Sequence, residues 1–67
     1  MIDNNINFES WYKGYYSNLV TTLTAVFNDR TLAEQASAEA CVKCYENWGR
    51  VSKMSSPEGW TYRVAQN

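Results

Sequence analysis

Histidine is absent from this 67-residue chain, which also has one proline, two cysteines and no long apolar run. Without histidine the chain lacks the usual general base and the commonest metal ligand. Because no nucleophile–base pair or metal-binding set is visible, we expect no enzyme, cofactor, metal or small-molecule substrate. No apolar run approaches the roughly 20 residues of a membrane span, and the polar start does not resemble a secretory signal. We therefore expect a cytoplasmic protein without a membrane contact.

Charge of either sign is also scarce. Six Lys and Arg stand against seven Asp and Glu, for a formal net charge of −1. A free-standing nucleic-acid binder normally carries a basic stripe. The composition therefore argues against a domain that holds duplex DNA by itself.

The two cysteines, Cys41 and Cys44, form a C-x-x-C pair. Such a pair belongs to a redox site or to half of a zinc site. A thioredoxin-like motif needs a preceding strand, and a zinc site needs two further ligands, neither of which the sequence offers. We favour the structural interpretation, in which both are small apolar residues on a helix face.

The length predicts one domain with one core, and at this size only roughly 60% of the unfolded chain's surface is buried on folding. Ten aromatic residues compensate, because large rings bury much area. The apolar spacing predicts an all-α, compact three-helix bundle with helices at about 7–27, 31–48 and 56–67. The predicted core is Trp11, Tyr15, Leu19, Leu23, Ala36, Ala40, Tyr45, Trp48, Trp60 and Val64.

Capping residues mark the predicted helix ends. Asn5 or Asn7 is expected to cap the first helix. The second begins either at a cap on Asp29 or at a capping box of Thr31 and Glu34, and Gly49 is expected to end it. Its predicted inner face is Leu32, Ala33, Ala36, Ala40, Cys44, Tyr45 and Trp48.

A polar loop is expected at residues 50–55, before the third helix. Ser56 and Pro57 then give a strong helix start, a capping Ser followed by Pro at the first helical position. The third helix stops at Asn67 without a stop signal, so we expect it to be cut short.

Three segments carry a family resemblance. Residues 8–16 read F-E-S-W-Y-K-G-Y-Y, residues 29–40 read D-R-T-L-A-E-Q-A-S-A-E-A, and residues 56–67 read S-P-E-G-W-T-Y-R-V-A-Q-N. Together they resemble conserved region two of the bacterial sigma-70 family of transcription initiation factors, in its extracytoplasmic-function branch. The last segment is the most specific and is similar to actinobacterial members. The resemblance covers about residues 8–67.

The resemblance implies that the second helix docks on the clamp coiled coil of the RNA polymerase largest subunit. Gln35 and Ala38 depart from the family pattern, which has an acid and a glutamine there, whereas Glu39 matches. The i, i+3, i+4 and i+8 spacing places the predicted contacts on one outward face. These polymerase-binding residues are Gln35, Ala38, Glu39 and Lys43.

The resemblance also implies that the loop and the third helix read the melted promoter −10 element as single-stranded DNA. A base outside the stack is recognised by pocket hydrogen bonds and by stacking. The predicted DNA-binding residues are Arg50, Lys53, Ser55, Ser56, Trp60, Arg63 and Asn67. The family's basic phosphate-contacting stretch would follow Asn67, so we expect a truncated region with weak affinity for duplex DNA.

Two classes of function stay open. One is a transcription initiation factor domain with RNA polymerase core and promoter DNA as partners. The other is a degenerate sigma-like interaction domain that binds an anti-sigma factor or itself without reading DNA. The aromatic residues of the first helix are expected to be core rather than a base-stacking platform.

Overall fold

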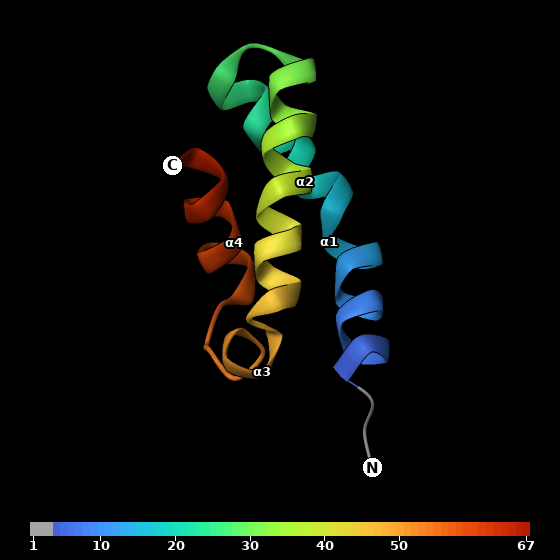
Figure 1. Ribbon diagram of the computed structural model, residues 1–67. Helices are drawn as coiled ribbons and strands as arrows, with labels where there is room; N and C mark the ends of the chain where they lie inside the picture. Colours follow the sequence, from blue (N-terminus) through green and yellow to red (C-terminus); the bar gives the residue numbers. More distant parts are fainter. Residues whose placement is uncertain (1–3) are drawn as a thin grey trace.

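The structure is a computed structural model that describes residues 4–67, with side chains from Asn7 onward. Every regular element in this range is a helix: α1 (Asn4–Phe27), α2 (Arg30–Glu46), α3 (Trp48–Val51) and α4 (Pro57–Gln66). Figure 1 shows α2 between α1 and α4, with α3 seen end-on where the chain turns from α2 into α4. The all-α expectation is confirmed, but the three-helix prediction is wrong because it missed α3.

The turn between α1 and α2 is built from two adjacent polar residues. Asn28 adopts the left-handed conformation, with φ of 55°, which Asn tolerates better than most residues. Asp29 then caps α2, because its carboxylate accepts the Leu32 backbone N–H at 3.0 Å. Of the two predicted starts for α2, the Asp29 cap is therefore the observed one. The caps predicted for α1 are wrong, since α1 already begins at Asn4.

A stripe of small residues lets the neighbouring helices approach α2 closely. The buried residues of α2 are Ala33, Ser37, Ala40, Cys41 and Cys44. Leu32 and Tyr45 were predicted on this face but are each 46% exposed. At 100° per residue, Leu32 lies about 120° and Tyr45 about 100° round the helix from the centre of the stripe, so the neighbouring helices cover each only in part.

The short helix α3 replaces the first part of the predicted loop. Helix α2 ends at Glu46 with Asn47 as its C-cap, so Gly49 lies inside α3 and does not end α2. Trp48 and Val51 of α3 are buried, Val51 completely. Burial of these two apolar side chains stabilises a helical turn that glycine would otherwise disfavour.

The core consists of two adjacent clusters. The first joins Leu19, Leu23, Ala33 and Cys41, and the second joins Cys44, Trp48 and Val51. Partly buried side chains complete both clusters, and they include the predicted core residues Trp11, Tyr15, Ala36 and Trp60. No helix in residues 4–67 is long and apolar enough to cross a bilayer. The domain is elongated, with extents of 42 × 18 × 17 Å.

Candidate nucleic-acid and protein interfaces

A groove of about 470 Å³ lies where the chain leaves α3 and enters α4. Ser56 starts α4, because its Oγ accepts the Gly59 backbone N–H at 3.0 Å and Pro57 occupies the first turn. The predicted helix start is therefore confirmed. The groove is lined by Met54, Ser55, Ser56, Gly59, Trp60 and Arg63.

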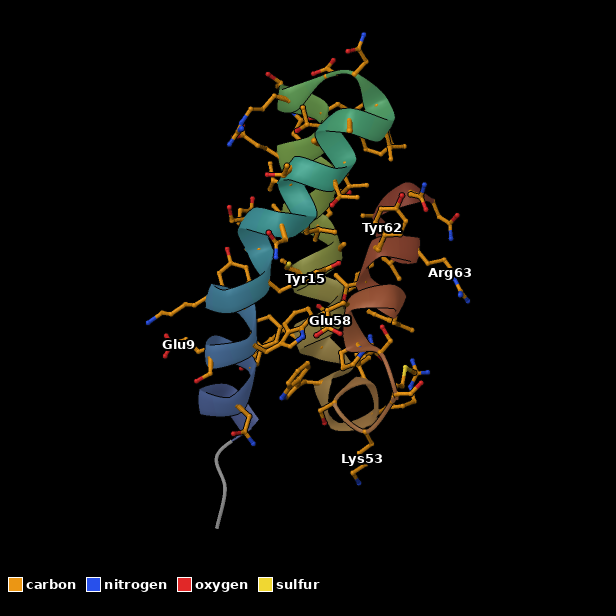
Figure 2. All side chains as sticks on the ribbon, turned by 180° about the vertical axis from the view of Figure 1, so that it is seen from behind. Glu9, Tyr15, Lys53, Glu58, Tyr62 and Arg63 are labelled. Carbon is orange, nitrogen blue, oxygen red and sulfur yellow. The ribbon has the colours of Figure 1, made fainter. Side chains whose placement is uncertain are left out.

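An aromatic ring and a cation face this α3–α4 groove. Trp60 is partly buried and packs against the cluster that contains Trp48 and Val51, so its ring is held in place. Arg63 follows it by three residues and is exposed, with its side chain pointing away from the bundle in Figure 2. Because residues three apart are neighbours on a helix surface, ring and guanidinium can contact one strand of nucleic acid together.

Glu58 ties the first turn of α4 to α1. Its carboxylate oxygen Oε2 accepts a hydrogen bond from Trp11 Nε1 at 2.6 Å, and its backbone carbonyl accepts one from the Tyr15 hydroxyl at 3.1 Å. Figure 2 shows Tyr15 and Glu58 between the two helices. Burial, followed by the charge of Glu58, raises the pKa of Tyr15 above its ordinary value. The sequence gave no sign of these hydrogen bonds between Glu58 and α1.

The other predicted DNA-binding residues lie apart from this groove. Arg50 is exposed on α3 and its Nη2 donates to Asn47 Oδ1 at 3.4 Å. Lys53 points outward at the end of the molecule in Figure 2, well away from Arg63. Asn67 is the C-cap of α4, where its N–H bonds to the Val64 carbonyl. Asn67 and Arg63 line different hollows, so the structure does not bring these two predicted residues together around one groove.

Asn67 instead lines a hollow of about 230 Å³ between α2 and α4. Three residues predicted to bind polymerase, Gln35, Glu39 and Lys43, line the same α2–α4 hollow. Ala38 is exposed too, but it lines a groove on the other side of α2. The prediction of one shared face is therefore wrong for Ala38, because positions 35–43 span a wide arc of the helix and α4 approaches only one part of it.

The second groove, between α1 and α2, is apolar and encloses about 340 Å³. Phe8 and Tyr12 line it from α1, and Val42 and Tyr45 line it from α2. The other aromatic residues of α1 pack inward, with Trp11 5.3 Å from Trp48 between ring centroids. Packing thus supports the core interpretation of Trp11 and Tyr15, while Tyr12 borders a surface groove.

Cys41 and Cys44 are both buried, and no disulfide joins them. Burial, and then the neighbouring Cys44, raises the pKa of the Cys41 thiol to about 11. Burial also raises the pKa of Cys44, although a side-chain hydrogen bond with Thr61 opposes this. Nucleophilic cysteines need lowered thiol pKa values, so this environment favours the structural interpretation. Within the described residues, no three Cys, Asp or Glu side chains gather in a way that would hold a metal ion.

Comparison of the chain with protein-family models, curated proteins and solved structures finds no match.

Proposed function

We propose that this chain is a transcription-initiation domain of the sigma-70 type. It binds the RNA polymerase clamp through α2 and reads melted −10 promoter DNA as a single strand in the α3–α4 groove. The observation that carries the proposal is the gathering of Ser55, Ser56, Trp60 and Arg63 around one groove. Such a domain acts in the cytoplasm and has no catalytic role of its own.

The chemistry of the α3–α4 groove suits an unpaired strand. Trp60 offers a ring held by the core, Arg63 offers a cation, and the two serines offer hydroxyl groups that donate and accept hydrogen bonds. Stacking of a base on an aromatic ring contributes roughly 1–3 kcal/mol and tolerates any base. Glu58 stabilises this groove, because its hydrogen bonds to α1 hold the first turn of α4 in position.

A matched pair of charge changes tests single-strand binding. Arg63→Ala removes the cation beside Trp60, whereas Lys13→Ala removes an exposed cation from α1. We expect Arg63→Ala to weaken binding of a short −10-like single strand several-fold and Lys13→Ala to leave it unchanged. Titration followed by amide resonances at low salt measures both. Equal weakening by the two changes would show that binding depends on the net charge of the chain and not on Arg63 itself.

The α2–α4 hollow supports polymerase binding through Gln35, Glu39 and Lys43. Glu39 is exposed and is the member of this set that matches the family pattern. We expect Glu39→Arg to weaken binding to the isolated clamp coiled coil, while Glu9→Arg, an exposed acid on α1, serves as the control. Calorimetry that gives equal affinities for the native chain and Glu39→Arg would refute this contact.

A second candidate is a sigma-like interaction domain without DNA reading, which binds an anti-sigma factor or another copy of itself. Its support is the separation of Asn67 from Trp60 and Arg63, which leaves the expected base-reading amide outside the α3–α4 groove. This candidate predicts no response to single-stranded DNA at Trp60 or Arg63.

A further inference from the structure

The connection between α3 and α4 places a thioether beside the α3–α4 groove. Met54 lies in this connection, which is orange in Figure 1, and its backbone N–H donates to the Val51 carbonyl at 3.0 Å. Its side chain is partly exposed and lines the groove together with Trp60 and Arg63. The groove encloses about 470 Å³, whereas a water molecule occupies about 30 Å³ of the liquid, so a solute as small as hydrogen peroxide has room to enter.

Met54 also belongs to the packing of the core. Its side chain packs against the cluster of Cys44, Trp48 and Val51, and Trp60 packs against the same cluster. Met54 therefore borders an open groove on one side and buried apolar surface on the other. A thioether fits this position because it is apolar, whereas methionine sulfoxide is polar and disrupts apolar packing.

The other sulfur atoms of residues 4–67 are shielded from solvent. Cys44 is completely buried and Cys41 is 4% exposed. Burial, and then the neighbouring Cys44, raises the pKa of the Cys41 thiol to about 11, so almost none of it is thiolate at neutral pH. Thiol oxidation requires the thiolate, but a thioether reacts without ionising. Within the described part of the chain, Met54 is therefore the sulfur most open to an oxidant.

We propose that Met54 is a site of oxidation by hydrogen peroxide, and that its sulfoxide displaces Trp60 from its place beside the α3–α4 groove. The sulfur lone pair attacks one peroxide oxygen, an S–O bond forms as the O–O bond breaks, and the other oxygen leaves as water with the displaced proton. The thioether is oxidised and the peroxide is reduced. The polar S–O group then leaves the apolar cluster, which loosens the packing that Met54 shares with Trp60.

The oxidation site does not depend on what the groove binds. Its consequence for DNA rests on the proposed function, in which the Trp60 ring stacks on a base. Displacement of that ring removes the stacking surface, so oxidation should weaken single-strand binding several-fold. Methionine sulfoxide is reduced enzymatically, so the change should be reversible.

Peroxide treatment of the whole chain at neutral pH tests the proposal. Peptide mass mapping, which separates Met54 from Met1, should show that Met54 gains one oxygen in the folded chain at a rate within a few-fold of its rate in urea. Both cysteines should react far more slowly in the folded chain than in urea. The indole proton resonance of Trp60 should shift with the oxidation of Met54, and methionine sulfoxide reductase should restore it.

Two variants separate oxidation of Met54 from other effects of peroxide. Met54→Leu keeps an apolar side chain of similar size, so peroxide should leave the Trp60 resonance unchanged. Met54→Gln introduces a polar side chain and should shift that resonance without peroxide.

The proposal is overturned if Met54 is protected in the folded chain as strongly as the cysteines. It is equally overturned if peroxide shifts the Trp60 resonance in Met54→Leu, or if Met54→Gln leaves that resonance in place. These readouts need no DNA. A native chain that oxidises as expected but does not bind a single strand would therefore refute the proposed function and support the oxidation site.

Discussion

Two hydroxyl groups are buried completely in the helix packing, and only one of them has a partner. Thr61 Oγ1 donates to the Pro57 carbonyl at 2.9 Å, whereas Ser37 Oγ has no hydrogen-bond partner among the described residues. A buried polar group without a partner retains its desolvation cost. Ser37 therefore sits in the core at a cost to stability, although its small size suits the close approach of helices at α2.

Replacing Ser37 with Ala is predicted to stabilise the domain by about 0.5–1 kcal/mol, because it removes an unpaired hydroxyl without removing a hydrogen bond. Urea unfolding of the variant measures the gain. Thr61→Val is the matched control, since it deletes a buried hydroxyl whose hydrogen bond is made, and it should give no gain. A loss of stability in Ser37→Ala would show that the hydroxyl has a partner in solution.

The buried thiols predict a specific dependence of stability on pH. The pKa of Cys41 is 9.0 in its ordinary state and about 11 in the fold, so the folded state favours the neutral thiol. Between these values the unfolded chain ionises first, and the free energy of unfolding must fall as pH rises from about 9 to about 11. Below pH 9 this contribution is fully present.

Cys41→Ala tests the origin of that slope, because it removes the Cys41 ionisation. The fall in unfolding free energy between pH 9 and 11 should become shallower in the variant, though not vanish, since the pKa of Cys44 is raised too. Chemical denaturation at several pH values measures the slope. An unchanged slope would show that other groups account for it.

At the scale of the elements, substitutions at the start of α2 distinguish the two capping arrangements that the sequence left open. Asp29 accepts the Leu32 N–H, so Asp29→Ala should destabilise the domain by about 1 kcal/mol, the usual value for losing an N-cap. Thr31→Ala should cost much less, because Thr31 lies inside α2. Thermal unfolding of both variants decides between the schemes. A larger loss from Thr31→Ala would restore the capping box.

The position of α4 depends on the hydrogen bonds between Glu58 and α1. Glu58→Ala removes the carboxylate that accepts the Trp11 indole N–H, which should cost about 1–2 kcal/mol. It should also shift the Trp11 indole proton resonance. Glu58→Gln keeps an acceptor oxygen and should retain most of both. If the alanine variant left the indole resonance unchanged, the hydrogen bond would not exist in solution.

The helices differ in how well the sequence predicts them. Helix α4 was predictable because Ser56 and Pro57 encode its start locally, and α1 was predictable because its apolar spacing runs for several turns. Helix α3 was not, because a single turn containing Gly49 has no periodicity of its own. Burial of Val51 holds it, and that burial depends on residues distant in the sequence, including Phe8 and Trp11.

At the scale of the whole molecule, the arrangement of helices decided which candidate residues meet. Spacing along α2 suggested that Gln35 and Ala38 face the same way, but α1 and α4 flank α2 and separate them into two surfaces. The α1–α2 groove was likewise invisible in the sequence, since Tyr45 was predicted to be core. Position on a helix is a local property, whereas exposure depends on which neighbour covers that position.

The same arrangement separates the two surfaces to which the proposed function assigns DNA and polymerase. The α3–α4 groove lies at the end where the chain turns back, and the α2–α4 hollow lies near the end of α4, where Asn67 joins it. In Figure 1, the turn from α3 into α4 and the C-terminal end of the chain lie at opposite ends of α4. Binding of single-stranded DNA at one and of protein at the other would therefore not compete for the same side chains.

The most direct test of the account is a map of amide shift changes as a short −10-like single strand is added at low salt. Stacking of one base contributes roughly 1–3 kcal/mol, so binding is expected near or weaker than 1 mM, which corresponds to about −4 kcal/mol. We expect the changes to concentrate in residues 54–63, around Trp60 and Arg63, and we expect a duplex of the same sequence to give smaller ones. Changes scattered over α1, with none in residues 54–63, would contradict it.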